Sequence, residues 1–214
     1  MYKVRVILKF LVKYKYMKNT IESNQEFNDQ EFKGLDLQGG EINFSEFNNC
    51  TFKNCNFLES NFSKNNFTDC KFKDCNLSLA KLNGTNFNGT KFTDCKIMGV
   101  NFKFCRIGLG FSFHFENCIL DSSNFNGLKL KECSFVKSRI KKVGFIEAGL
   151  IKCDFSQCDF QDSTFDNTDL SESNFEGAVN YAINPIKNTI KKAKFSMPEA
   201  ISLIKYLDVT ITNM

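Results

Sequence analysis

The 214-residue chain contains no tryptophan, only two prolines and a single histidine, His114. It has no glycine-rich phosphate-binding loop, no nucleophile elbow and no Cys-x-x-Cys pair of the kind that binds zinc. It also lacks any run of about 18 uncharged apolar residues, the length that a membrane-spanning helix needs. These absences argue against an enzyme and against an integral membrane protein.

Residues 1–18 are basic and apolar, as signal peptides are, but Lys9, Lys13 and Lys15 interrupt the apolar run and no small-residue cleavage site follows. We therefore expect a cytoplasmic protein. Apolar residues alternate from Val4 to Val12, which is typical of a strand. Residues 1–16 are thus either a strand-like N-terminal cap or a result of start-site choice, with Met17 as the true start.

Large apolar residues recur at every fifth position. From Phe27 to Ile107 every fifth residue is Phe, Leu or Ile, and the series resumes at Phe115 and runs to Phe175. A period of five fits neither a helix nor a strand. It fits a coil that turns a corner at each repeat and directs each apolar residue to a common axis. We expect this core ladder to include Phe52, Phe57, Phe62, Phe67, Phe72, Phe87, Phe92, Phe155, Phe160 and Phe165.

The residue two positions before each core residue is usually small, and all ten cysteines occur there. The five-residue unit, as in Cys50–Asn54 or Ser173–Gly177, resembles the repeat of the pentapeptide-repeat family over roughly residues 25–179. The resemblance implies an all-β fold, a right-handed quadrilateral β-helix in which four repeats form one square coil. About 30 repeats would give about 7.5 coils and, at roughly 4.8 Å per coil, a rod about 35 Å long. We expect three segments: an N-terminal extension or cap (1–24), the β-helix (25–179), and a C-terminal helix and tail (180–214).

With a coil of 20 residues, Cys55, Cys75 and Cys95 stack in one column, and Cys133 lies near Cys153. A disulfide framework and a metal site are both alternatives. We favour buried free thiols that pack as small apolar groups and stay reduced in a cytoplasm.

Three additional residues interrupt the series between Ile107 and Phe115. The segment from Gly108 to His114 is either a bulge that kinks the coil, which we favour, or a short recognition loop. His114 has no partner motif, so we expect a surface residue without a catalytic role.

The C-terminal segment contains a helix signal. Ser196 and Glu199 have the spacing of a capping box, which predicts a helix from Met197 to about Leu207. We expect its main apolar face to cover the last coil; this face consists of Met197, Ala200, Ile201, Ile204 and Leu207. We also expect Val209 to Thr212 to form a short strand after the helix. Surplus apolar surface at Leu203, Tyr206 and Leu207 predicts a dimer interface, because two open rod ends meet naturally around a two-fold axis.

The tail sequences Asn180–Pro185 and Ala193–Ala200 resemble the quinolone-resistance (Qnr) branch of the same family. This resemblance implies a cytoplasmic homodimer that binds DNA gyrase and topoisomerase IV, protects them from quinolones and imitates duplex DNA. We expect no cofactor, no small-molecule substrate and no direct binding of nucleic acid or membrane. Some members of the branch have longer loops, and this chain has only the short interruption before Phe115.

Charge is unevenly distributed along the chain, whose net charge is +4. Residues 1–18 carry six bases and no acid, residues 50–146 are net +8, and residues 147–180 carry eight acids against Lys152. We expect these acids to form a partner-binding surface: Glu147, Asp154, Asp159, Asp162, Asp166, Asp169, Glu172 and Glu176.

Two interpretations of these acids remain open: recognition of a basic DNA-binding groove, or solubility alone. The family tail favours recognition. The functional alternative is a protein-interaction or immunity scaffold for another toxin or partner.

Overall fold

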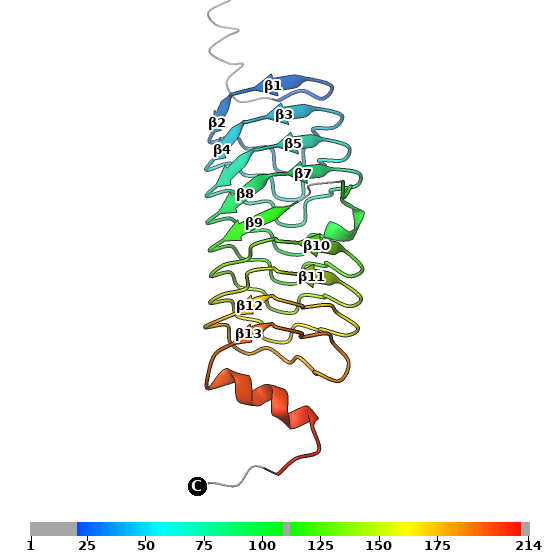
Figure 1. The fold of residues 1–214 in the computed structure, drawn as a ribbon. Helices are drawn as coiled ribbons and strands as arrows, with labels where there is room; N and C mark the ends of the chain where they lie inside the picture. Colours follow the sequence, from blue (N-terminus) through cyan, green and yellow to red (C-terminus); the bar gives the residue numbers. More distant parts are fainter. Residues whose placement is uncertain (1–20, 109–111, 211–214) are drawn as a thin grey trace, which may run out of the picture.

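The structure, a computed structural model, describes residues 21–108 and 112–210. They form a parallel β-solenoid of about eight turns, stacked as a rod with the C-terminal helix at one end (Figure 1). The all-β solenoid fold expected from the repeat is confirmed. The strands are β1 (Glu26–Asn28), β2 (Glu31–Lys33), β3 (Glu46–Asn48), β4 (Thr51–Lys53), β5 (Asn66–Thr68), β6 (Lys71–Lys73), β7 (Asn86–Asn88), β8 (Thr90–Thr93), β9 (Phe113–Glu116), β10 (Lys129–Lys131), β11 (Gly149–Ile151), β12 (Asn174–Phe175) and β13 (Lys194–Phe195).

Residues 20 positions apart lie beside one another in adjacent coils. Phe47 in β3 pairs with Phe27 in β1, and Phe52 in β4 pairs with Phe32 in β2. This parallel pairing forms two long sheets, β1-β3-β5-β7 and β2-β4-β6-β8-β9, and two short ones, β10-β11 and β12-β13. Isolated bridges, such as Asp36 with Asn56, join the coils elsewhere. Each coil therefore has four sides, one for each five-residue repeat.

The phenylalanines fill the axis of the rod. Rings in one column stack, as Phe52 and Phe72 do at 4.6 Å between centroids and 10° between planes. Rings on adjacent sides meet edge to face, as Phe52 and Phe57 do at 5.9 Å and 75°. Both geometries are favourable for aromatic pairs. All ten phenylalanines expected in the core ladder are buried.

Many of the small residues two positions before a core residue donate a hydrogen bond to the preceding coil. The Oγ1 of Thr85 donates to the carbonyl oxygen of Phe62 at 2.5 Å, and the Sγ of Cys70 donates to that of Phe47 at 3.2 Å. In both pairs the acceptor is a core residue of the preceding coil. A side chain that fits beside the backbone and carries a donor satisfies this carbonyl, which explains why cysteine, serine and threonine are common here, although alanine also occurs, as at Ala80 and Ala148.

The corners of the coil require backbone with positive φ. Two residues after a core phenylalanine, Asn54 has a φ of 51° and Asp74 has a φ of 53°. Asn and Asp tolerate this left-handed conformation better than most residues with a Cβ, which favours them at this position. Side chains there project outward, so even Leu79 is 51% exposed.

The interruption changes the stacking step from 20 to 23 residues and keeps the pairing. Phe92 pairs with Phe115, and Thr90 pairs with Phe113, across β8 and β9. Phe113 is fully buried in the slot that a small residue occupies elsewhere, and its ring lies 6.1 Å from that of Phe87. Ile107, expected in the core, is only partly buried. A short 3-10 helix, η2 (Phe102–Phe104), precedes the interruption.

Residues 109–111 lie outside the described residues, so the choice between bulge and recognition loop stays a prediction. His114 lies in β9, where it pairs in register with Lys91. Burial and the charge of Lys91 lower the pKa of His114.

Backbone pairing continues beyond residue 179, the boundary expected for the β-helix. Thr189 bridges to Asp169, and Phe195 in β13 pairs with Phe175 in β12. The rings of Phe175 and Phe195 stack at 5.1 Å, so Phe195 extends the core ladder by a partial coil.

The capping box predicted at Ser196 and Glu199 is wrong. The helix is a 3-10 helix, η3 (Glu199–Tyr206), and its N-cap, Pro198, makes no side-chain cap hydrogen bond. The Oγ of Ser196 instead accepts from the backbone N–H of Gly177 at 2.8 Å, and Oε1 of Glu199 accepts from that of Asn180 at 3.4 Å. The open end of the solenoid exposes backbone donors, and these two side chains satisfy them. They therefore cap the rod and not the helix.

The strand expected after the helix is not formed at Val209 and Thr210, and residues 211–214 lie outside the described residues. No helix among the described residues has the length and apolarity needed to cross a membrane. The expected N-terminal cap or start-site artefact, which concerns residues 1–16, also lies outside the described residues.

Replacing Phe92 with Ala should lower the free energy of unfolding by about 3–5 kcal/mol, because it empties a buried site between Phe72 and Phe115. Urea denaturation followed by circular dichroism measures the change. Phe104→Ala is the matched control, since Phe104 is 54% exposed, and should change stability by no more than about 0.5 kcal/mol. Equal effects of the two substitutions would contradict the core assignment.

Candidate protein-interaction surfaces

The eight acids expected to bind a partner lie around the rod and not on one side of it. Three of the acids directly precede core residues that belong to different sides of the coil. These acids are Asp154, Asp159 and Asp169, which precede Phe155, Phe160 and Leu170. We call the eight residues the acidic band: Glu147, Asp154, Asp159, Asp162, Asp166, Asp169, Glu172 and Glu176. The structure therefore brings them into neighbouring coils and presents them in several directions.

Three members of the acidic band have local structural roles. The Oδ1 atoms of Asp154, Asp159 and Asp169 accept hydrogen bonds from the backbone N–H two residues later, at 2.9, 3.2 and 3.0 Å. Such turns stabilise the path from one side of the coil to the next. These carboxylates are partly committed to the fold, which explains why Asp or Asn precedes so many core residues.

Asp159 is the most strongly held of the three. Its Oδ2 lies 3.0 Å from the Nζ of Lys141, and its Oδ1 accepts from Nδ2 of Asn180 at 2.8 Å. Burial raises its pKa, but the hydrogen bonds from Asn180 and Lys141 outweigh burial, so the pKa is lowered. Asp159 is therefore a poor position at which to test partner binding.

The remaining acids are freer to meet a partner. Glu147, Asp162, Glu172 and Glu176 are exposed. Glu147, Asp162 and Glu172 occupy corners with positive φ, where side chains project outward. Asp166 is half-buried, and its Oδ1 lies 3.9 Å from the Nζ of Lys187, a distance at which an exposed ion pair contributes little.

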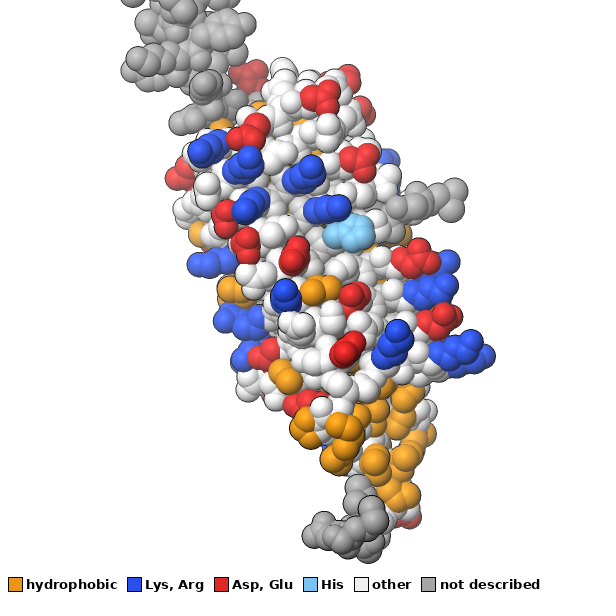
Figure 2. All heavy atoms as spheres, turned by 60° about the vertical axis from the view of Figure 1, so that its left-hand side comes forward, with side chains coloured by type: hydrophobic (Ala, Val, Ile, Leu, Met, Phe, Trp, Pro, Cys, Tyr) orange, Lys and Arg blue, Asp and Glu red, His pale blue; other side chains and the backbone are white. Residues whose placement is uncertain are grey.

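Apolar side chains are exposed at the C-terminal end of the rod. Met197 is 70% exposed, Ile201 45%, Leu207 43% and Val209 57%. Figure 2 shows hydrophobic side chains gathered over this end. We call these four residues the apolar end. No residue of η3 is buried, so the helix covers the last coil only in part.

The orientation of η3 differs from the sequence-based expectation. Leu203, expected at a dimer interface, packs against the core, and Tyr206 is half-buried with the Nζ of Lys205 lying 4.9 Å from its ring centroid. Met197 and Ile201, expected to cover the last coil, face solvent. The spacing of apolar residues predicts the faces of an α-helix, and a 3-10 helix distributes the same residues differently. Of the three residues expected at the interface, Leu207 is exposed.

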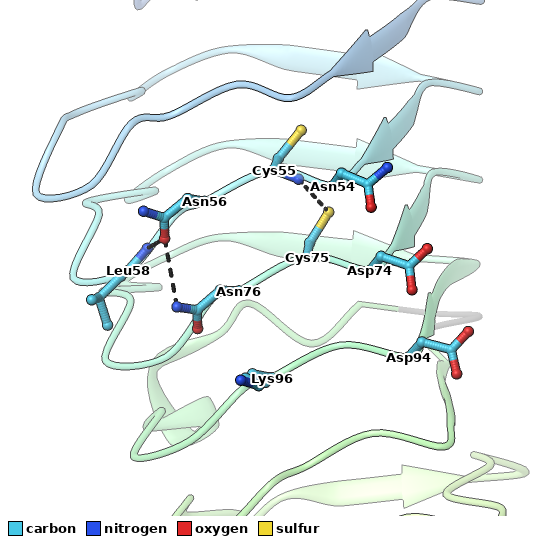
Figure 3. A pocket seen from close by; sticks show the side chains of 9 residues that line it. All are labelled: Asn54, Cys55, Asn56, Leu58, Asp74, Cys75, Asn76, Asp94 and Lys96. Carbon is cyan, nitrogen blue, oxygen red and sulfur yellow. Dashed lines mark hydrogen bonds between the residues drawn. The ribbon is translucent and has the colours of Figure 1, made fainter.

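A shallow groove crosses the side of the rod next to the long five-stranded sheet. Its lining includes the stacked amides of Asn56 and Asn76, with Asp74, Asp94 and Lys96 at its edges (Figure 3). Nδ2 of Asn76 lies 3.5 Å from Oδ1 of Asn56, which also accepts from the N–H of Leu58 at 3.3 Å. Much of the amide hydrogen bonding thus serves the coil itself. Among the described residues, no group of three or more His, Cys, Asp or Glu side chains could hold a metal ion.

All ten cysteines are buried as free thiols. In the column that includes Cys55 and Cys75, the backbone N–H of Cys55 donates to Sγ of Cys75 at 3.5 Å (Figure 3). Burial raises the pKa of Cys70 to about 12 and that of Cys158 to about 12. Thiols with such pKa values stay protonated near neutral pH and are poor nucleophiles.

Alkylation with iodoacetamide should therefore leave Cys70 and Cys158 unmodified in the folded protein at pH 8, about four units below their pKa values. The same treatment in denaturant should modify all ten cysteines. Mass spectrometry of tryptic peptides gives the occupancy at each site. Rapid modification of Cys70 in the native state would show that the thiol is accessible and contradict its burial.

A sequence profile described as the pentapeptide repeat region matches residues 45–108 and 111–180, more than half of the chain. The chain therefore belongs to the pentapeptide-repeat family. No curated protein matches the sequence.

Solved structures of QnrB1, a plasmid-mediated fluoroquinolone resistance protein, share the fold. Two trypsin-treated forms are 17% and 19% identical to this chain, with TM-scores of 0.67 and 0.68. Each match covers 89% of this chain, and the two matches cover 98% and 99% of the QnrB1 chains. The full-length form is 20% identical, with a TM-score of 0.60, and the match covers 88% of this chain and 99% of that one. At these identities the similarity shows a common fold and no more.

Proposed function

We propose that this protein is a cytoplasmic homodimer that binds DNA gyrase and topoisomerase IV through DNA mimicry and protects them from quinolones. The observation that carries the proposal is the proximity of the apolar end to the acidic band. The hydrogen bond between Ser196 and Gly177 holds the start of the C-terminal segment against the coil that carries Glu176. The fold shared with QnrB1 and the Qnr-like tail support the same assignment.

Dimerisation through the apolar end would place the acidic bands of the two copies next to each other. Four exposed apolar residues at the end of a rod form a patch that a second copy covers well, because each copy offers the same surface. Two acidic bands would then flank the two-fold axis in the middle of a long rod. Because these acids lie around the rod, carboxylates would face a partner from whichever side it approached.

The acidic centre of this dimer would attract a groove built to hold DNA. Such grooves are basic, and complementary charge increases the rate of association and fixes the orientation of a complex. Glu147, Asp162, Glu172 and Glu176 are the carboxylates best placed for this role, since they are exposed. The protein would then compete for a DNA-binding surface through contacts alone, without a covalent step.

The variant Glu147→Gln/Asp162→Asn/Glu172→Gln should lose protection of gyrase in a supercoiling assay with a fluoroquinolone. These substitutions remove exposed charge and keep the side-chain length and the hydrogen bonds of the coil. Titrating the wild-type protein should restore supercoiling at or below micromolar concentrations. Full protection by the triple variant would exclude these carboxylates as the binding surface.

The control variant is Glu22→Gln/Glu26→Gln/Glu46→Gln, which removes three exposed carboxylates from the other end of the rod. It has the same net charge as the first variant and should protect gyrase as the wild type does. If both variants lose protection equally, total charge and not the C-terminal surface determines binding.

The variant Ile201→Glu/Leu207→Glu should convert the dimer to a monomer, because it places charge in the apolar end. Light scattering after size exclusion should give twice the chain mass of 24.5 kDa for the wild type and a single chain mass for the variant. The control, Leu79→Glu/Phe104→Glu, changes two exposed apolar residues elsewhere on the rod and should stay dimeric. A monomeric wild type would remove the dimer from the proposal.

The basic middle of the chain favours a second candidate function, an interaction scaffold for another toxin or partner. Residues 50–146 are net +8, which departs from a uniformly DNA-like rod. If the wild type neither rescues nor inhibits gyrase, this alternative becomes the better one, and affinity capture with the intact dimer would identify the partner.

A further inference from the structure

The long five-stranded sheet presents a lysine-rich surface to solvent. Lys33, Lys53 and Lys73 pair in register on β2, β4 and β6, and Lys71 pairs in register with Lys91 on β6 and β8. We call these five residues the lysine face. Figure 2 shows Lys and Arg side chains gathered in this region beside the single histidine, His114, which continues the column of Lys71 and Lys91.

The fold does not require lysine at these positions. In the same coils, the neighbouring sheet carries Asn66 and Thr68 on β5, and Asn86 and Asn88 on β7, at the equivalent outward positions. Such neutral residues can hydrogen-bond from coil to coil, as Asn48 does with Asn28 at 3.0 Å. Stacked lysines repel one another instead, since coils lie roughly 4.8 Å apart. The lysine face therefore accepts an electrostatic cost that the adjacent side of the rod avoids.

Most of the lysine face is not neutralised within the chain. Among the described residues, its one ion pair joins the Nζ of Lys53 to Oε2 of Glu31 at 2.7 Å. The acids Asp69, Asp74 and Asp94 lie at the flanking corners, and no ion pair joins them to these lysines in the described part of the chain. His114 is largely uncharged at neutral pH, since its pKa is lowered. The charge of Lys33, Lys71, Lys73 and Lys91 is thus available to an external anion.

The chemistry of the surface indicates which anion fits. None of the exposed large apolar side chains among the described residues belongs to β2, β4, β6, β8 or β9. A protein partner is normally anchored by apolar and aromatic groups at the centre of the interface. Five lysines among polar neighbours offer point charges without directional readout. Such a surface suits a linear polyanion that is recognised by its charge.

We propose that the lysine face binds the phosphodiester backbone of nucleic acid, without sequence preference. The lysine columns run along the rod axis, so several lysines can neutralise successive phosphates and release the counterions condensed on the nucleic acid. This proposal departs from the expectation that the protein makes no direct contact with nucleic acid. It is independent of the topoisomerase proposal, because it uses the opposite half of the rod from the acidic band.

Fluorescence anisotropy with a labelled mixed-sequence DNA duplex tests the proposal. The wild type should bind with a Kd on the order of 10⁻⁴–10⁻⁶ M, and log K should fall with log salt by about 0.9 for each phosphate neutralised. The variant Lys71→Gln/Lys73→Gln/Lys91→Gln should reduce that slope by about 3 and weaken binding at low salt. A single-stranded DNA arm should bind with a slope of about 0.7 per phosphate, since the backbone alone is recognised.

The matched control is Lys81→Gln/Lys96→Gln/Lys103→Gln, which removes three exposed lysines from other sides of the same part of the rod. It has the same net charge as the first variant and should keep the wild-type slope. Circular dichroism melting of both variants verifies that each is folded.

Three outcomes would overturn the proposal. The first is that the wild type binds neither the duplex nor the single strand at about 50 mM salt. The second is that both triple variants lose binding equally, which would show that binding depends on the net charge of the protein and not on the lysine face. The third is that polyglutamate displaces the duplex at equal charge concentration, and the face would then bind acidic protein surfaces. Retained gyrase protection by the lysine variant would confirm that the two proposed activities are separable.

Discussion

The structure depends on the parallel stacking of one coil on the next at hydrogen-bonding distance. Because residues 20 positions apart pair in register, each side chain repeats the environment of its neighbour in the coil before. Phenylalanine suits the axis because its rings stack within a column and meet edge to face between columns. The same constraint favours cysteine, serine and threonine two positions before a core residue, since their side chains donate to a buried carbonyl of the preceding coil.

Stacking also creates the surfaces with which the protein would act. In most globular folds, charged residues that are far apart in the sequence do not line up in space. In this solenoid, side chains spaced 20 residues apart lie in register on adjacent coils and form a column. Lys33, Lys53 and Lys73 form such a column on one sheet, whereas the acidic band is divided among several sides. The open end of the last coil, with its unpaired backbone donors, requires Ser196 and Glu199 as caps and leaves apolar residues of the tail exposed.

The interruption before Phe115 shows how far the stacking tolerates irregularity. The sequence has three additional residues at this point, yet β8 and β9 remain paired in register. The interruption changes the packing of the core instead. Ile107 is displaced toward the surface, and Phe113 enters a slot that normally holds a small residue. The ring of Phe113 thereby replaces apolar volume that the displaced side chain of Ile107 no longer supplies at the axis.

The sequence alone predicted the solenoid, the core ladder and the burial of the cysteines, because a five-residue period fits a coil that turns a corner at each repeat and the repeat resembles that of a known family. It also located the acidic and basic stretches of the chain. Only the tertiary structure distinguished the acids that stabilise turns, Asp154, Asp159 and Asp169, from those that project freely, such as Glu147 and Asp162. It also showed that Leu203 packs inward, whereas Met197 and Ile201 face solvent. These distinctions depend on contacts between coils and on the last open edge, where hydrogen-bond donors of Gly177 and Asn180 compete with the helix for the same side chains. The local capping-box pattern therefore does not decide the partners of Ser196 and Glu199, because the backbone donors of the last coil lie within their reach.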